Sequence, residues 1–366
     1  MHFCGGRIGC SPERTPIVTA VRRRRSLRRS AAALVATLAV TAGTALLAQP
    51  AGAHPKPPSP GHHKVSGYVA LGDSYASGEG LAPFAEGTDG PGECHRSASQ
   101  SYPVRLADSR KRAFDGLTSV ACSGAITADL VTTRPNTTRA PQLAALNRKT
   151  ETVTLTIGGN DAGFSVIFGD CVYTVAPELA PVVPGSPGCA TRGDLVVSIR
   201  IAALAGGKNA PVLPGVYPLP DALRAVAAVA PRAKIYVTGY PQIFGSKITN
   251  PLGCQVNDQA PLFVTADDAA WVRSKAKQLN TGIASAVKTA RRAGVNAHYV
   301  DVAGVFRGHN LCDQKPTKKP KSPWLNGVVL TQVSPTDPPS FSQASFHPTA
   351  RGQQAYASAV RHRAWR

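Results

Sequence analysis

The chain has 366 residues, 43% of them apolar, and a formal net charge of +20. This composition excludes a disordered protein and allows one or two domains with a substantial core. The basic residues are scattered, and their densest cluster, 315–321, lies in a proline-rich segment without interleaved aromatic side chains. We therefore expect a solvated loop there and no nucleic-acid partner, although a basic chain could be attracted to acidic polymers or anionic lipid surfaces.

Residues 1–53 have the pattern of a secretory signal. Arginines at 22–25 and 28–29 precede a small-apolar run from Ala31 to Ala48, and an A-x-A-like cleavage site follows at 51–53. A membrane anchor is the alternative, but an Ala/Thr-rich run before a processing site favours cleavage and an extracellular protein. The paired arginines leave general and twin-arginine export both open. Because the leader holds eight arginines and one glutamate, cleavage leaves a charge of +13 and a flexible start at 54–65.

From residue 66 the sequence predicts a single domain, 66–366, in which strands and helices alternate. Apolar bursts of strand length lie at Tyr68–Leu71, Leu117–Ala121, Val153–Ile157, Lys234–Thr238 and His298–Val302. Segments of helical character lie at Tyr102–Arg112, Pro220–Val229, Asp267–Ala293 and Pro348–Ala364. This alternation predicts a parallel sheet covered by helices on both faces. Three stretches without clear periodicity are predicted to be long loops: 164–219, 250–262 and 310–345.

Six cysteines remain after the leader: Cys94, Cys122, Cys171, Cys189, Cys254 and Cys312. An even number in an exported chain argues for three disulfides, but the spacing does not choose among the fifteen possible pairings. Two of the six lie in the first aperiodic stretch, which favours disulfide bracing of that stretch. No C-x-x-C pair is present and no histidines cluster beside the cysteines, so we expect no zinc site.

Ser74 lies in the motif GDSY at 72–75, directly after the first predicted strand. Open α/β sheets place their chemistry at this carboxyl end of the strands. A serine hydroxyl becomes an effective nucleophile only when a base takes its proton. We predict that His347 is this base, because Pro348 occupies a good first-turn position of the last helix and fixes the histidine at its start. Taken alone, a His-Pro pair would be an ordinary helix entry.

Two further motifs could stabilise an oxyanion. Gly124 follows a serine after the second predicted strand, and Asn160 lies in the motif GGND at 158–161 after the third. Together with the backbone N–H of Ser74 they could supply three donors, each typically worth about 3 to 4 kcal/mol in a transition state. Taken one at a time, both motifs would be ordinary turns.

In combination and in this order, the motifs resemble those of the SGNH hydrolases, the GDSL lipase/esterase family. The resemblance covers roughly Tyr68 to Val360 and rests on GDSYASGEG at 72–80, CSGA at 122–125, IGGNDAGF at 157–164 and SFHP at 345–348. Similarity to the secreted actinobacterial branch lies in CHRS at 94–97 with Tyr102-Pro103, and in Gly308-His309 with Cys312 and Pro323-Trp324.

The resemblance implies a flavodoxin-like three-layer α/β/α fold with about five parallel strands. It also implies hydrolysis of carboxylic esters without a metal or other cofactor. The family's functional residues map to Ser74 and His347 as catalytic groups and to Ser74, Gly124 and Asn160 as oxyanion donors. Secreted members further imply the disulfides Cys94–Cys122, Cys171–Cys189 and Cys254–Cys312. We expect a monomer that acts on small-molecule or lipid esters and makes transient contact with lipid surfaces.

One position departs from the family pattern, which has an acid three residues before the histidine. Here that position is Ala344, so no carboxylate is available. We predict that the main-chain carbonyl of Ala344 orients the ring of His347 instead, and that a Ser-His dyad replaces a triad. The neighbouring acids Asp73 and Asp161 are predicted to brace loops.

The substrate stays open among short-chain esters, acylglycerols, phospholipids and acetylated polysaccharides. A lipid substrate would favour an exposed apolar rim, for which Phe164, Val166, Ile167 and Phe168 are candidates, although they could equally be core. A non-catalytic module that binds cell-wall polymer or membrane is disfavoured by the presence of all four motifs. An α/β-hydrolase is disfavoured because GDSYA at 72–76 lacks the closing glycine of G-x-S-x-G.

Overall fold

The computed structural model describes residues 67–110, 114–134, 139–183, 185–313, 322–331 and 340–365. The predicted leader, the flexible start and the basic cluster at 315–321 lie outside the described residues. Five parallel strands form the central sheet in the order β2-β1-β3-β5-β8. They are β1 (Tyr68–Gly72), β2 (Leu117–Ser119), β3 (Thr152–Thr156), β5 (Lys234–Thr238) and β8 (Ala297–Val300). All five correspond to predicted strands.

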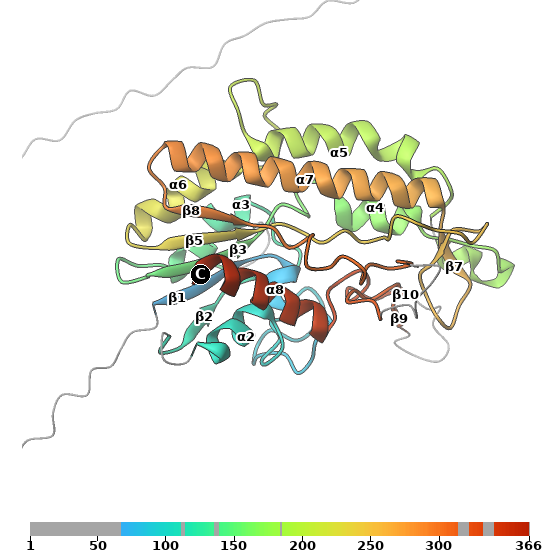
Figure 1. Ribbon diagram of the computed structural model, residues 1–366, viewed down its shortest axis with the longest axis horizontal. Helices are drawn as coiled ribbons and strands as arrows, with labels where there is room; N and C mark the ends of the chain where they lie inside the picture. The colour runs from blue at the N-terminus through green and yellow to red at the C-terminus, as the bar shows by residue number, and fades with distance from the viewer. Residues whose placement is uncertain are drawn as a thin grey trace, which may run out of the picture. The chain divides into compact units, whose positions relative to one another are not determined.

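Helices cover both faces of this sheet (Figure 1). On one face lie α2 (Tyr102–Ser109) and α8 (Ala350–Ala364), and on the other lie α6 (Leu219–Val229) and α7 (Ala266–Arg292). These helices also correspond to predicted ones. The strand order and the two helical layers make the fold a flavodoxin-like three-layer α/β/α sandwich. The fold prediction is therefore confirmed.

Buried hydroxyl groups inside the sheet pair with one another. All five residues of β3 are buried, although three of them are threonines. The hydroxyl of Thr154 lies 2.9 Å from that of Tyr68, and Thr156 lies 2.9 Å from the hydroxyl of Tyr102 and 2.6 Å from that of Thr238. Because the hydroxyls of Thr154 and Thr156 have partners, these positions of the strand can be buried without a large desolvation cost.

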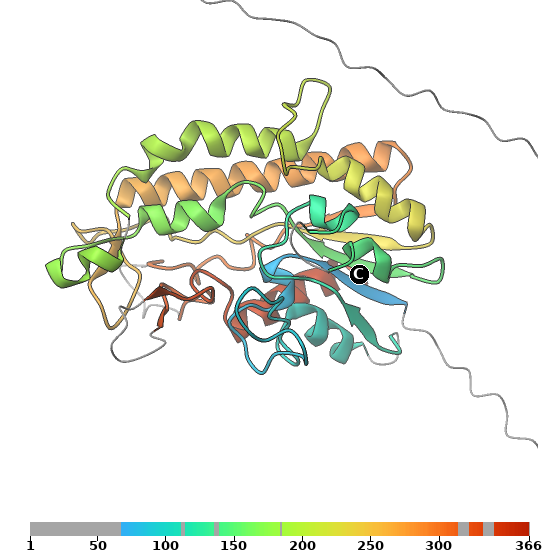
Figure 2. The ribbon, with the colours of Figure 1, turned by 180° about the vertical axis from the view of Figure 1, so that it is seen from behind.

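The first aperiodic stretch is not a long loop. It contains α4 (Phe164–Cys171) and the 17-residue α5 (Cys189–Ala205), and Figures 1 and 2 show α5 running along α7 and α4. The prediction was wrong here because α5 exposes Leu195 (70%), Val196 (58%) and Ile199 (38%). Apolar residues on both its inner and outer faces erase the periodic stripe by which an amphipathic helix is recognised.

Short elements complete the fold. A three-stranded sheet has the order β4-β7-β6, and β9 pairs antiparallel with β10, so the other two aperiodic stretches also contain some regular structure. The bounds of the remaining elements are α1 (Ser74–Ser77), α3 (Ala128–Val131), η1 (Gln142–Ala145), η2 (Pro177–Val182), β4 (Tyr173–Thr174), β6 (Cys254–Gln255), β7 (Leu262–Val264), β9 (Leu330–Thr331) and β10 (Ser340–Phe341).

Three disulfides cross-link segments that follow or precede the main elements of the fold. The pairs are Cys94–Cys122, Cys171–Cys189 and Cys254–Cys312, the same pairs that the family resemblance implies. The second disulfide connects the end of α4 to the start of α5, so these two helices are joined covalently. Among the described helices, none combines the length and the apolar character needed to cross a lipid bilayer.

Candidate active site

The candidate site lies where the strand order reverses, at the carboxyl ends of β1 and β3. β1 ends at Gly72, whose φ is +133°, and a Cβ atom there would lie 2.2 Å from the carbonyl oxygen of Thr156 on β3. Only glycine allows this close approach. The chain then turns, and the carboxylate of Asp73 caps α1 by accepting a hydrogen bond from the N–H of Tyr75 at 2.9 Å. Ser74 is thereby held as the first residue of α1.

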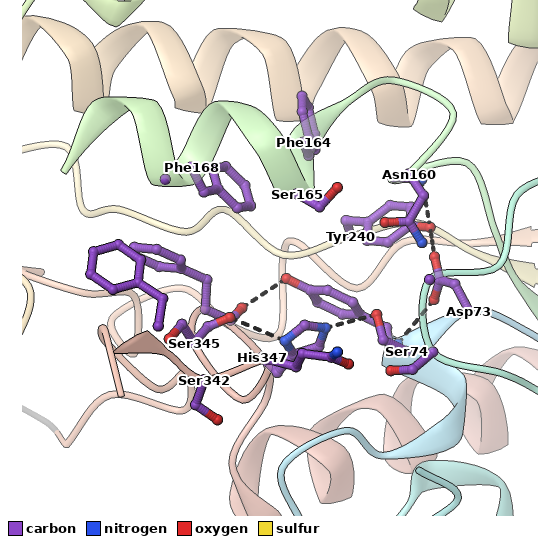
Figure 3. A pocket seen from close by; sticks show the side chains of 18 of the residues that line it. Asp73, Ser74, Asn160, Phe164, Ser165, Phe168, Tyr240, Ser342, Ser345 and His347 are labelled. Atoms are coloured by element: carbon purple, nitrogen blue, oxygen red, sulfur yellow. Dashed lines mark hydrogen bonds between the residues drawn. The ribbon is translucent and has the colours of Figure 1, made fainter. Parts of the chain in front are cut away.

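Ser74 and His347 meet across 273 positions of the sequence. The Nε2 atom of His347 lies 2.7 Å from the Oγ atom of Ser74, and its Nδ1 atom lies 3.1 Å from the carbonyl oxygen of Ser345 (Figure 3). A carbonyl oxygen can only accept, so Nδ1 carries the proton of the neutral ring. Nε2 therefore presents its lone pair to the hydroxyl of Ser74, which is the arrangement required of a general base.

The prediction that Ala344 supplies the orienting carbonyl is wrong. The N–H of His347 donates to the carbonyl of Ala344 at 3.2 Å, which closes a four-residue turn, and the side-chain amide of Asn326 donates to the same oxygen at 3.1 Å. Phe346 takes a φ of +61° inside this turn. Because the turn uses the carbonyl of Ala344, the carbonyl of the next residue, Ser345, is the one that faces the ring.

Burial lowers the pKa of His347 below its ordinary value. The negative charge of Glu79 and the main-chain carbonyls of Ser345 and Gln343 oppose this shift without cancelling it. The imidazole is therefore neutral at pH 7 and able to accept a proton.

The two predicted oxyanion residues other than Ser74 lie in adjacent loops. Gly124 and Asn160 line the same cavity as Ser74 and His347. The side-chain amide of Asn160 donates to the carbonyl of Ala125 at 3.0 Å, so the loops after β2 and β3 are tied together. An amide group carries two protons and this bond uses one.

Asp73 and Asp161 lie in the buried network beneath the site, as loop-bracing residues would. Asp161 accepts from the backbone N–H of Thr127 at 3.0 Å and from its hydroxyl, while Asp73 accepts from the hydroxyl of Tyr240. Burial raises the pKa of Asp73 to about 7 and that of Asp161 to about 6. Both carboxylates thus bind the loops through hydrogen bonds, and the partner of Nδ1 of His347 is the carbonyl of Ser345 and neither of them.

Sequence reasoning missed two tyrosines that hold the site. The hydroxyl of Tyr240 donates to Asp73 and accepts from the N–H of Gly159 at 2.9 Å, so it joins the first and third motifs. The hydroxyl of Tyr75 donates to the carbonyl of Phe346 at 2.9 Å, which joins the nucleophile's helix to the histidine's turn. Tyr240 could have been found from its position, because it follows β5 and therefore lies at the same edge of the sheet as the motifs.

The site opens into a cavity of about 690 Å³. Its far wall is aromatic: Phe164 and Phe168 of α4 line it together with Phe346. The other two candidates for an apolar rim behave differently. Val166 is 67% exposed, whereas Ile167 packs beneath α5, where a Cβ atom on Gly193 would lie 2.5 Å from its Cδ1 atom.

No cluster of three or more metal-ligating side chains occurs in the described part of the chain.

Comparison with known proteins identifies this arrangement. The model of the GDSL-like lipase/acylhydrolase family matches residues 70–355. The chain belongs to this family. It is therefore a carboxylic ester hydrolase, and the resemblance drawn from its motifs is confirmed.

Relatives of this GDSL-like hydrolase come from Streptomyces, in agreement with the actinobacterial branch. A lipase of Streptomyces rimosus is 31% identical over 290 residues, which cover 79% of this chain and 83% of the relative. The crystal structure of phospholipase A1 from Streptomyces albidoflavus is 29% identical, with a TM-score of 0.58 over 82% of this chain and 99% of the other. The extracellular lipase of Streptomyces rimosus gives 29% identity and a TM-score of 0.56 over 81% and 98% of the two chains.

Proposed function

We propose that the hydrolase cleaves esters through an acyl-enzyme on Ser74, with His347 as general base and the carbonyl of Ser345 as the group that orients the ring. The observation that carries the proposal is the line of contacts from Ser345 O through the imidazole to Ser74 Oγ, at 3.1 and 2.7 Å. A carbonyl dipole fixes the tautomer and the ring direction, although it stabilises an imidazolium less than a full negative charge would.

In the proposed cycle, Ser74 Oγ attacks the ester carbonyl carbon while its proton passes to Nε2 of His347. The oxyanion of the tetrahedral intermediate accepts hydrogen bonds from the N–H groups of Ser74 and Gly124 and from the amide of Asn160. Collapse breaks the bond to the alcohol, which leaves with the proton from His347. Water then attacks the acyl-enzyme, again giving a proton to His347, and the free acid departs.

The proposed substrates are lipid esters with an extended acyl chain. An aromatic wall of Phe164, Phe168 and Phe346 supports an apolar acyl group, since a site for acetylated sugars would need little apolar length. The names of the relatives support acylglycerols and phospholipids as the two classes to compare. Three disulfides and the predicted leader support secretion, and we propose that the mature hydrolase works as an extracellular monomer.

The dyad is tested by Ser74→Ala and His347→Ala, assayed with p-nitrophenyl butyrate. We expect each to lower kcat on the order of 10⁵- to 10⁶-fold, the loss typical when a nucleophile or its base is removed. Ser274→Ala and His362→Ala are matched controls, because both residues are exposed on helices, and they should keep wild-type activity. Unchanged circular dichroism and thermal midpoints would show that the variants are folded. Wild-type turnover by Ser74→Ala would overturn the proposal.

The base role also predicts the pH dependence. Only neutral His347 can accept the proton, so kcat/KM should rise as the pH increases through the pKa of this residue. Because burial lowers this pKa, the midpoint should lie below the ordinary value of 6.5. A midpoint well above 6.5 would contradict the assignment of His347 as a buried base.

A further inference from the structure

The carboxylate of Glu79 is buried beside the site. It does not lie on the segment before His347, where the family pattern has its acid, but on the segment that follows Ser74. Glu79 is 3% exposed and follows α1 closely, with its N–H donating to the carbonyl of Ser74 at 3.1 Å. It belongs to the motif GDSYASGEG, but the proposed catalytic cycle gives it no role. A carboxylate with so little exposure needs partners that offset its desolvation.

One hydrogen-bond partner of Glu79 belongs to the Ser123–Gly124 loop, which carries a proposed oxyanion donor. Its Oε2 atom accepts a hydrogen bond from the hydroxyl of Ser123, the residue immediately before Gly124. Its Oε1 atom accepts from the N–H of Gly80 at 3.1 Å. The position of Gly124 is therefore coupled to a side chain on the segment that carries the nucleophile.

His95 is the counter-charge of this carboxylate. Its Nδ1 atom lies 2.9 and 3.0 Å from the two oxygens of Glu79, and its Nε2 atom lies 2.8 Å from the carbonyl of Gly90. Both ring nitrogens thus face groups that can only accept, which is the bonding pattern of an imidazolium. Burial lowers the pKa of His95, but its hydrogen bond to Glu79 and the charge of Glu79 outweigh burial, so the pKa is raised overall.

The first disulfide holds the two partners of Glu79 in place. Cys94 directly precedes His95, and Cys122 directly precedes Ser123. The ring of His95 also stacks on Phe84, with 4.9 Å between the ring centroids. The carboxylate therefore lies between two segments whose separation is fixed covalently.

Glu79 is also close to the turn that carries His347. Gly80 has a φ of +80°, and a Cβ atom on it would lie 2.7 Å from the Cβ atom of Ala344. The segment of Glu79 thus packs against the turn at the position where the family pattern has its acid. In agreement with this proximity, the negative charge of Glu79 raises the pKa of His347 against the effect of burial.

We propose that Glu79 is a positioning residue of the hydrolase: it holds the Ser123–Gly124 loop in place and supplies through space the negative charge that the segment of His347 lacks. The proposal rests on the proposed roles of Ser74 and His347. The charged and titratable groups around Glu79 are His95 and His347. Asp89 lies near His95, and Tyr75 packs against the ring of His347. Arg134 donates to the carbonyl of Ser123 at 3.4 Å.

Glu79→Gln tests the charge while keeping the shape of the side chain. We expect kcat for p-nitrophenyl butyrate to fall about 10- to 100-fold with little change in KM, less than the 10²- to 10³-fold typical when an oxyanion donor is deleted, because the loop is loosened and not removed. Loss of the negative charge should lower the pKa of His347 further, which moves the acid limb of the kcat/KM profile measurably toward lower pH.

Ser123→Ala separates the two roles. This variant breaks the hydrogen bond to the oxyanion loop but leaves the charge of Glu79, so kcat should fall while the acid limb stays in place. Glu79→Asp keeps the negative charge, but its shorter side chain no longer reaches the hydroxyl of Ser123. It should therefore behave like Ser123→Ala. If Glu79→Gln does not fold, Glu79→Asp takes its place in the test. Glu151→Gln is the control, because this carboxylate pairs with Arg232 at 3.1 Å beside the opposite end of β3, and it should change neither quantity.

A wild-type kcat in Glu79→Gln would overturn the proposal, and so would an acid limb that does not move in that variant. If Glu79→Gln does not fold, the test rests on Glu79→Asp. The proposal would then be overturned by a wild-type kcat in Glu79→Asp, or by an acid limb that shifts in this variant. These failures differ from failure of the dyad: a fluorophosphonate probe should still label Ser74 in every Glu79 variant, whereas turnover by Ser74→Ala would overturn the dyad whatever Glu79 does.

Discussion

The two walls of the cavity are held in different ways. The polar wall is supplied by residues 73–75, 123–124 and 159–160 of the strand-end segments, and hydrogen bonds between buried or half-buried groups connect these segments. Tyr240 links Asp73 to Gly159, and the side-chain amide of Asn160 reaches across to the loop after β2. Each of these bonds joins residues that are far apart in the sequence.

The aromatic wall consists of α4 and Phe346, and it is held mainly by packing. The ring centroid of Phe168 lies 5.4 Å from that of Phe164 and 5.3 Å from that of Phe346. Behind it, Ile167 fits against α5 at Gly193. These contacts are apolar and have little directional preference.

The difference matches what each wall is proposed to do. Proton transfer and oxyanion binding depend on distances of a few tenths of an ångström, which directional hydrogen bonds between buried groups can fix. Acyl chains differ in length and shape, and apolar packing tolerates such variation at modest cost. Changes in the polar wall should therefore affect the turnover of all esters alike, whereas changes in the aromatic wall should affect the choice among esters.

Asn160→Ala gives the largest effect expected within this comparison. Removal of one oxyanion donor typically lowers kcat by about 10²- to 10³-fold. We expect the same factor for p-nitrophenyl acetate and p-nitrophenyl decanoate, because the oxyanion is identical in both. Asn296→Ala, at an exposed position before β8, is the control and should be silent. A loss confined to the longer ester would mean that Asn160 contacts the acyl chain, and the contrast between the walls would fail.

Two disulfides sharpen the comparison, because one braces each wall. Cys94–Cys122 holds the polar wall over a sequence separation of 28, and Cys171–Cys189 holds the aromatic wall over a separation of 18. Loop-closure entropy assigns both bonds a similar stabilisation, about 3 to 4 kcal/mol. Replacing either pair by alanines should therefore lower the free energy of unfolding by similar amounts in denaturant titrations.

The activities of the two disulfide variants should differ. Without Cys94–Cys122, the partners of Glu79 are no longer fixed, so we expect kcat for p-nitrophenyl butyrate to fall several-fold under conditions where the variant is folded. Without Cys171–Cys189, kcat for this short ester should stay near that of the wild type. Equal losses of kcat in both variants would show that the walls are not independent.

The polar wall was largely predictable from the sequence. Its motifs follow buried strands, and apolar bursts of four or five residues mark where those strands end. Ser74, Gly124 and Asn160 could therefore be placed at one sheet edge, and the structure brings them together with His347 in one cavity. What could not be predicted is the bonding among these loops, because Tyr240 and Glu79 reach partners 167 and 44 positions away without any periodic signal.

Two residues of the aromatic wall, Phe164 and Phe168, were candidates from the sequence, and both line the cavity. The helices of this region were not predicted, for two physical reasons. α4 is only eight residues long, and α5, which packs against it, carries apolar side chains on its exposed face and so has no amphipathic stripe. The carbonyl that orients His347 was misplaced by one residue because it depends on the backbone conformation of Phe346. A positive φ at a phenylalanine is uncommon and has no signature in the local sequence.

Phe168→Ala should alter selectivity more than turnover. This ring lines the cavity opposite the polar wall, so its removal takes away packing that a long acyl chain would contact and a short one would not reach. Loss of such a contact typically costs about 1 to 2 kcal/mol, which predicts an approximately 10-fold fall in kcat/KM for p-nitrophenyl decanoate. For p-nitrophenyl acetate the change should stay within about 2-fold, since the oxyanion donors and the dyad are untouched. The ratio of the two kcat/KM values measures the effect without depending on the amount of active enzyme. Equal losses for both esters would place Phe168 among the residues that support the chemistry, and the aromatic wall would then have no separate role.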